Sequence, residues 1–139
     1  MPINLAMSGC GMPKPDITRT RRNCSGVGVN GWPIEEHVAG NIAFRWQDTP
    51  ASRGFNHLPY RMLLPQQVDN LLVAGRCASM THLGQSAARV SGGCFVMGQA
   101  AGTAAALAAR SWVRPRALEV WALQEKLQAD GAYLGMDVQ

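Results

Sequence analysis

The chain has 139 residues, of which 47% are hydrophobic and 16% are charged, and its formal net charge is +4. This length suits one ordinary domain, and this composition is typical of a folded soluble protein and argues against a disordered one. The positive charge is mild, and its densest run is the short Arg19-Thr20-Arg21-Arg22. Because nucleic-acid binders concentrate their basic residues into a stripe, we expect no nucleic-acid partner.

The four cysteines are Cys10, Cys24, Cys77 and Cys94. No two of them are spaced as C-x-x-C, so we expect neither a structural zinc nor an iron–sulfur cluster held by this chain alone. The residues after Met1 lack the basic and then apolar segments of a secretory signal. We therefore expect a cytoplasmic protein with reduced thiols.

Residues 1–26 are weakly patterned, whereas residues 27–58 resemble short strands joined by turns. Asn30-Gly31 is a turn signal, and the alternation of Ile42, Phe44 and Trp46 predicts a half-buried strand. Residues 48–54 are expected to form a loop. We interpret residues 27–58 as a β-rich segment and residues 1–26 as poorly defined.

Residues 59–110 carry a different pattern. Asp69-Asn70 predicts a turn, and the following Leu71-Leu72-Val73-Ala74 is apolar on both faces. Such a run suits a strand of a parallel sheet that helices cover on both sides. A polar loop is expected from Gly75 to about residue 91, and then a helix rich in glycine and alanine from about residue 92 to residue 110.

The uncharged stretch 90–109 contains Gly98-x-x-x-Gly102 and is long enough to span a membrane. Its residues are mostly small, and Ala and Gly contribute little to membrane insertion. We therefore favour a helix packed against a sheet. In the last segment, residues 111–139, a helix is predicted over 115–128 with Gly131 as its stop, because Leu118, Trp121, Leu123 and Leu127 recur at helical spacing.

A strand, Gly75, a loop and a glycine-rich helix start form the kind of unit at which α/β sheets bind ligands. At Ser91-Gly92-Gly93 the first backbone N–H groups of the helix have no partner within the helix, and they carry a partial positive charge. Two glycines let a flat ring or a phosphate approach the main chain. The pattern favours an anion or a carbonyl oxygen at this point, although many helices simply begin with Ser-Gly.

The spaced residues of this region resemble a known family over roughly residues 27–134. The matching strings are Asn30-Gly31-Trp32-Pro33-Ile34-x-x-His37, Pro59-Tyr60-Arg61-x-Leu63-x-Pro65, Asp69-Asn70-Leu71-Leu72-Val73-Ala74-Gly75-Arg76-Cys77-x-Ser79-x-Thr81-His82, Arg89-Val90, Cys94 and Met97-Gly98-Gln99-Ala100-Ala101-Gly102. They look like the C-terminal region of the FAD-dependent oxidoreductase family, which is often grouped with the flavin subunit of heterodisulfide reductase.

The resemblance implies an FAD cofactor and an α/β, doubly wound (Rossmann-like) fold, of which residues 59–110 are the C-terminal part and residues 27–58 the end of a substrate-side domain. It also implies roles for individual residues. Gly75 and Arg76 would lie beside the FAD phosphates or ribityl chain, and Ser79 would also bind the cofactor. At the pyrimidine edge of the flavin ring would lie Ser91, Gly92, Gly93 and Cys94; His82 and Arg89 would face the substrate side, and Tyr60 and Arg61 would line the wall of the cleft.

Three of these residues have alternative interpretations. Arg89 either orients an acidic substrate or pairs with a carboxylate such as Asp69. His82 is an acid, base or substrate ligand, or it only hydrogen-bonds the scaffold. Cys94 is a redox thiol or, as is common near a helix start, a small apolar filler.

The nucleotide-binding half of such a fold begins with a strand, a Gly-x-Gly-x-x-Gly turn and a helix. Gly26-x-Gly28 comes nearest to this unit, but no helical pattern follows it. We therefore expect activity only beside a separate half that grips the adenine and pyrophosphate, together with a small-molecule substrate. The alternative is a relic or interaction module that binds no flavin. The unpaired edge of segment 71–74 predicts self-association of the chain alone.

Overall fold

The computed structural model describes residues 25–45 and 54–135. In chain order its elements are β1 (Gly26–Asn30), β2 (Ile34–Val38), β3 (Asn41–Arg45), β4 (Asn56–Pro59), η1 (Tyr60–Leu63), η2 (Gly75–Cys77), α2 (His82–Ala88), α3 (Ser91–Arg110), η3 (Pro115–Ala117) and α4 (Val120–Ala129). The basic run at 19–22, Cys10, Cys24, Trp46 and most of the loop expected at 48–54 lie outside the described residues.

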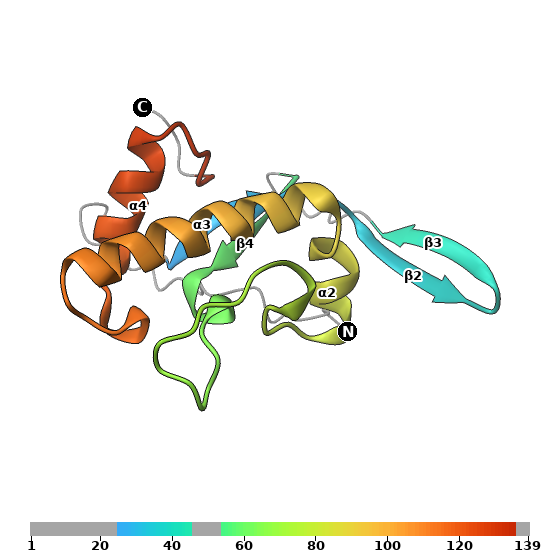
Figure 1. Ribbon diagram of the computed structural model, residues 1–139. Coiled ribbons are helices and arrows are strands. Elements are labelled where there is room, and N and C mark those ends of the chain that lie inside the picture. The colour runs from blue at the N-terminus through green and yellow to red at the C-terminus, as the bar shows by residue number, and fades with distance from the viewer. Residues whose placement is uncertain (1–24, 46–53, 136–139) are drawn as a thin grey trace, which may run out of the picture.

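The central layer is a two-stranded antiparallel ladder of β1 and β4, beneath α3 (Figure 1). Gly26 pairs with Pro59 and Asn30 pairs with Asn56, and the register shifts between Gly26 and Val29. Val27 and Leu58 point into the core, where they are almost fully buried. This ladder gives α3 and α4 a common surface on which to pack.

α3 confirms the predicted helix of small residues, and it lies directly on β1. Its buried positions recur every three or four residues, as a helix with one packed face requires: Gly93, Met97, Ala100, Ala104 and Ala108. The approach to β1 is so close that a Cβ atom on Gly28 would lie 2.1 Å from Cγ1 of Val96. The small residues of α3 and β1 therefore serve close helix–strand packing.

The opposite face of α3 is open. Phe95 is 76% exposed, and Gly98 and Gly102 have open space where a side chain would be. By length and composition α3 could cross a membrane, and 28% of its most apolar window is buried. A core helix of a soluble protein meets the same test. The exposed face is available to a further layer, which the described residues do not supply.

β2 and β3 form a hairpin that projects from the body of the molecule (Figure 1). Its turn is at Ala39 and Gly40, whose positive φ angles of 50° and 80° match the twist of a two-residue hairpin. The expected turn at Asn30-Gly31 is wrong, because Asn30 is the buried last residue of β1. The strand through Ile42 is confirmed but not its half-burial, since every residue of β3 is exposed, although the ring of Phe44 has an edge contact with Trp32.

The expected strand at 71–74 is absent. After the predicted turn at Asp69 and Asn70, the segment runs without strand pairing, and Leu71 is 46% exposed. One backbone bond ties it to the body, from the N–H of Val73 to the carbonyl of Leu63 (2.9 Å). A segment becomes a strand only when its backbone hydrogen-bonds to a neighbouring strand. The described residues contain two antiparallel two-stranded sheets and no parallel sheet that segment 71–74 could join.

The C-terminal helix is shorter than predicted. Pro115 opens the 3₁₀ turn η3, and α4 starts at Val120. Leu123 and Leu127 are buried as the helical spacing predicts, but Trp121 is half-exposed. The mixture of helices and small antiparallel sheets is consistent with an α/β protein.

The predicted stop at Gly131 is confirmed by a left-handed φ of +84°. Its N–H bonds the carbonyl of Gln128, and the N–H of Ala132 bonds that of Leu127, each at 2.9 Å. This is how a glycine ends a helix, since it satisfies the last carbonyl groups at a φ that other residues avoid. Gln124 fastens the helix to β1 by donating to the carbonyl of Gly26 (2.7 Å).

Candidate functional site

The junction between α2 and α3 is compact and is built by local capping. The hydroxyl of Thr81 accepts the N–H of Gly84 (3.1 Å) and so caps the start of α2. α2 ends at Ala88 with Arg89 as its C-cap, and the extended Val90 is the N-cap of α3, which begins at Ser91. The polar loop expected between residues 75 and 91 therefore contains a helix, because Thr81 supplies the cap that an isolated sequence pattern did not reveal.

The start of α3 is left uncapped by the side chains of the described residues, and its first turn carries no acidic group. Ser91 and Gly92 are exposed, and a Cβ atom added to Gly92 would meet nothing within 4 Å. The first N–H groups of a helix lack acceptors within it, and they lie at the positive end of its dipole. This point can therefore receive an anion or a carbonyl oxygen.

Gly93 differs from its neighbour because packing already explains it. A Cβ atom at Gly93 would lie 2.6 Å from the carbonyl oxygen of Ala88 and 3.4 Å from Oδ1 of Asn30. Asn30 in turn donates to the carbonyl of Ala87 (3.2 Å), which joins the end of β1 to α2. Gly93 thus keeps α2, α3 and β1 together, whereas Gly92 faces open space.

The turn η2 lies beside this helix start, as the sequence predicted for Gly75 and Arg76. Gly75 has a φ of +63°, and a Cβ atom there would approach Sγ of Cys94 to 3.4 Å. Nε of Arg76 donates to the carbonyl of Arg89 at 3.4 Å, and Gln85 donates to the carbonyl of Arg76 at 3.2 Å. The structure therefore brings Gly75, Arg76, Arg89 and Cys94 into one cluster.

Arg89 is held by a carboxylate, but not by the expected one. Its Nη2 donates to Oε1 of Glu35 at 2.8 Å, and Nε2 of His37 lies 3.6 Å from the same oxygen. Asp69 instead pairs with Arg114 at 2.8 Å. The pairing with Asp69 is therefore wrong, because segment 69–74 runs outside any sheet that would have carried it toward α2.

His82 and Ser79 lie apart from the cluster. His82 is the exposed first residue of α2, and seven residues of helix place it about 10 Å along the axis from Arg89. Ser79 lines a separate hollow together with Thr81 and Arg61. Cys94 is partly buried, and its thiol donates to the carbonyl of Arg89 at 3.5 Å.

Tyr60 was expected in the wall of a cleft but belongs to the core. It is 2% exposed, and its hydroxyl donates to the carbonyl of Pro115 at 2.9 Å. Burial raises the pKa of Tyr60 to about 12, because the charged phenolate would lose its hydration. Tyr60 therefore ties η1 to η3 and does not face a ligand.

Three glycines around β1 do not form a phosphate-binding turn. Gly26, Gly28 and Gly31 have the Gly-x-Gly-x-x-Gly spacing, yet the first two lie within β1 and no helix follows. Gly28 instead makes room for Val96 of α3. The spacing alone was ambiguous, and the missing helix pattern was the signal that it does not form a phosphate-binding turn.

The described residues contain no group of three or more His, Cys, Asp or Glu side chains that could hold a metal ion. Cys77 is exposed, and neither it nor Cys94 forms a disulfide.

Comparison with known proteins identifies a family for this chain. The family model described as FAD dependent oxidoreductase matches residues 8–127. No curated protein and no solved structure matches the chain significantly. The family match spans most of the chain, including η2, α2 and α3. The chain therefore belongs to the FAD dependent oxidoreductase family, whose cofactor is FAD.

Proposed function

We propose that residues 75–94 form the flavin-ring side of the FAD site of an oxidoreductase. A dinucleotide-binding half, on the same chain or a separate one, completes the site by holding the pyrophosphate and adenine. The motif strings around residues 59–102 favour the heterodisulfide reductase-like members of the family. We place the protein in the cytoplasm and leave its small-molecule substrate unnamed.

One observation supports the proposal above all others. The start of α3 offers unpaired N–H groups next to open space at Gly92, and Gly75 and Arg76 flank it. A flavin ring needs donors at its pyrimidine edge and a backbone without side chains to lie against. The residues present therefore fit this part of the cofactor.

The start of α3 and Arg76 have separate roles in this proposal. The N–H groups of Ser91 and Gly92 donate to the carbonyl oxygens of the ring, and Arg76 lies toward the ribityl chain and phosphates. Gly93 and Cys94 keep the helix start in place through their packing. When bound, FAD supplies the site with a two-electron acceptor.

Arg89 and His82 are assigned to the substrate side. Arg89 is 34% exposed in its side chain and shares Glu35 with His37. The pair fixes the guanidinium while leaving donors for an acidic group of a substrate. His82 is exposed on the same side of α2, about two turns away, where it can serve as an acid or base for a larger substrate.

A second half also explains two open features of the fold. Within residues 25–45 and 54–135, nothing covers the exposed face of α3, and no strand pairs with segment 71–74. A parallel sheet supplied by the nucleotide-binding half would cover the first and pair with the second. This is the arrangement of a doubly wound fold, in which helices cover both faces of one sheet.

The proposal is tested by titrating the purified chain with FAD and following flavin fluorescence, with and without a Gly-x-Gly-x-x-Gly domain of the family. Gly92→Leu should abolish binding, because its side chain fills the space left for the ring. Gly98→Leu is the matched control, since it places the same side chain in open space on the same helix. Both variants should fold, as leucine favours helices more than glycine does.

Binding only in the presence of the added domain, and its loss in Gly92→Leu alone, would support the split site. Equal binding by the two variants would show that the ring does not lie at Gly92. No binding under any condition would favour a relic that has lost its flavin. With binding established, Arg89→Gln should raise KM for an acidic substrate more than it lowers kcat.

A further inference from the structure

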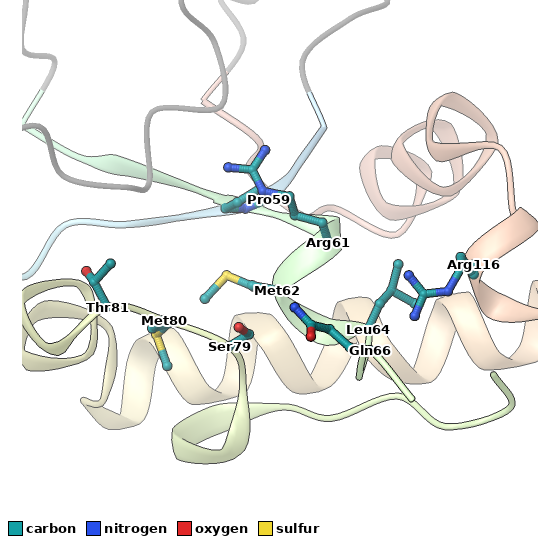
Figure 2. A pocket seen from close by; sticks show the side chains of 9 residues that line it. All are labelled: Pro59, Arg61, Met62, Leu64, Gln66, Ser79, Met80, Thr81 and Arg116. Carbon is teal, nitrogen blue, oxygen red and sulfur yellow. The ribbon is translucent and has the colours of Figure 1, made fainter. Parts of the chain in front are cut away.

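A hollow of about 340 Å³ lies on the side of the molecule formed by η1, the segment after η2 and η3. Figure 2 shows Thr81 and Arg116 at opposite ends of it, with Met62, Ser79 and Gln66 between them. It belongs neither to the start of α3 nor to the pair formed by Arg89 and Glu35. Its lining includes Ser79 and Arg61, for which the family resemblance implies places at the cofactor.

The charge of this hollow is positive. Its lining includes Arg61 and Arg116 and no acidic residue. The carbonyl of Arg61 accepts the N–H of Leu64 (3.2 Å), but among the described residues its exposed side chain has no ion-pair or hydrogen-bond partner. A guanidinium without a partner at the edge of a hollow is available to an anion.

Arg116 is held so that it faces the hollow. Its Nη2 donates to the carbonyl of Pro65, and its Nε lies 3.8 Å from Oδ1 of Asp69. Asp69 is paired more closely with Arg114, at 2.8 Å. The single carboxylate of Asp69 therefore faces both Arg114 and Arg116, so it neutralises only one of these two positive charges.

The remaining lining suits an organic anion. Ser79, Thr81 and Gln66 add hydroxyl and amide donors, while Met62 and Leu64 provide an apolar floor. The hydroxyl of Thr81 already accepts the N–H of Gly84, and its own hydrogen remains for a ligand. Donors surrounded by arginines match the oxygens of a phosphate group, which accept several hydrogen bonds at once.

We infer that this hollow binds the phosphate group of a small organic molecule, with Arg61 and Arg116 as the charged ligands. The phosphate has two possible sources, namely a separate phosphorylated ligand and the diphosphate of FAD, and the second would replace the assignment of that diphosphate to the dinucleotide-binding half. The inference does not depend on the flavin ring lying at Gly92. The two proposals can therefore fail separately.

The test is calorimetric titration of the full chain with inorganic pyrophosphate at low ionic strength, where exposed charges are least screened. Arg61→Ala and Arg116→Gln should each weaken binding by about tenfold, the usual effect of losing one charge-assisted hydrogen bond. Arg110→Ala is the matched control, because it removes an exposed arginine at the end of α3 outside the hollow. Far-UV circular dichroism checks that all three variants are folded.

Pyrophosphate binding that is lost in Arg61→Ala and Arg116→Gln but kept in Arg110→Ala would support the site. Absence of binding, or an equal loss in all three variants, would overturn it, since the interaction would then reflect only net charge. Competition identifies the source. If FAD displaces pyrophosphate, the ligand is the diphosphate of the cofactor, and simultaneous binding of both identifies a separate phosphorylated molecule.

Discussion

The two adjacent glycines at the start of α3 should respond in opposite ways to the same substitution. In Gly93→Ala the new Cβ would lie 2.6 Å from the carbonyl oxygen of Ala88, which belongs to the backbone and cannot rotate away. In Gly92→Ala the new atom would meet nothing within 4 Å. The pair therefore separates packing from helix propensity at neighbouring positions.

The magnitude follows from two opposing terms. Alanine favours a helix over glycine by about 1 kcal/mol in a helix interior, and by less in the first turn. Overpacking a close contact costs about 1 to 3 kcal/mol, because α2 or α3 must shift. We expect Gly93→Ala to lower the free energy of unfolding by about 1 to 2 kcal/mol, and Gly92→Ala to leave it unchanged or slightly raised.

Urea unfolding of both variants, followed by circular dichroism at the helix band, measures this difference. The slope of the transition must match that of the wild-type chain, so that the free energies can be compared. If Gly93→Ala proves as stable as Gly92→Ala, the close packing of α3 on α2 is wrong. The assignment of Gly92 alone to the ligand would then lose its structural basis.

Three further predictions follow from the packing and the exposed surface. Gly28→Ala should destabilise the chain by about 1 to 3 kcal/mol through its contact with Val96, and Val96→Ala should relieve that cost in a double-mutant cycle of urea unfolding. Burial raises the pKa of Tyr60 from 10.0 to about 12, so between these pH values the unfolded chain loses the phenolic proton while the folded chain keeps it. The free energy of unfolding should therefore be highest below pH 10 and fall by about 3 kcal/mol as the pH rises through 12. In Tyr133→Phe, which leaves one tyrosine, phenolate absorbance should therefore titrate near pH 12 when folded and near pH 10 in urea; equal midpoints would refute the burial. The chain alone should self-associate in light scattering, and Phe95→Lys should reduce this, because Phe95 is 76% exposed on the uncovered face of α3; a monodisperse wild-type monomer would contradict it.

The local sequence was sufficient for α3 and for the end of α4, but not for α2. The run of small residues at 91–110 predicts α3 because its buried positions recur at helical spacing, and Gly131 ends α4 because it alone tolerates the left-handed angle that is needed. The sequence also placed Gly75 near the glycine-rich helix start, and the structure brings Gly75 beside Cys94 of α3. Such features depend on interactions between residues near one another in sequence.

Other features depended on which distant residues became neighbours. Leu71 and Leu72 are apolar enough for a strand, but a strand needs a paired partner, and the described residues supply none. Ile42 lies in a strand as predicted and yet is exposed, because the hairpin projects away from the body. The sequence pattern indicates which face of a segment is apolar. Whether that face is buried depends on the elements that the tertiary structure packs against it.

By itself, the sequence determined that this is a FAD dependent oxidoreductase family member with a glycine-rich helix start beside Gly75 and Arg76. Only the tertiary structure separated Gly92, which faces open space, from Gly93, which packs on Ala88. It also replaced Asp69 by Glu35 as the partner of Arg89. The physical reason is that residue type and spacing specify local conformation, whereas steric contact and charge pairing are properties of residues brought together from distant parts of the chain.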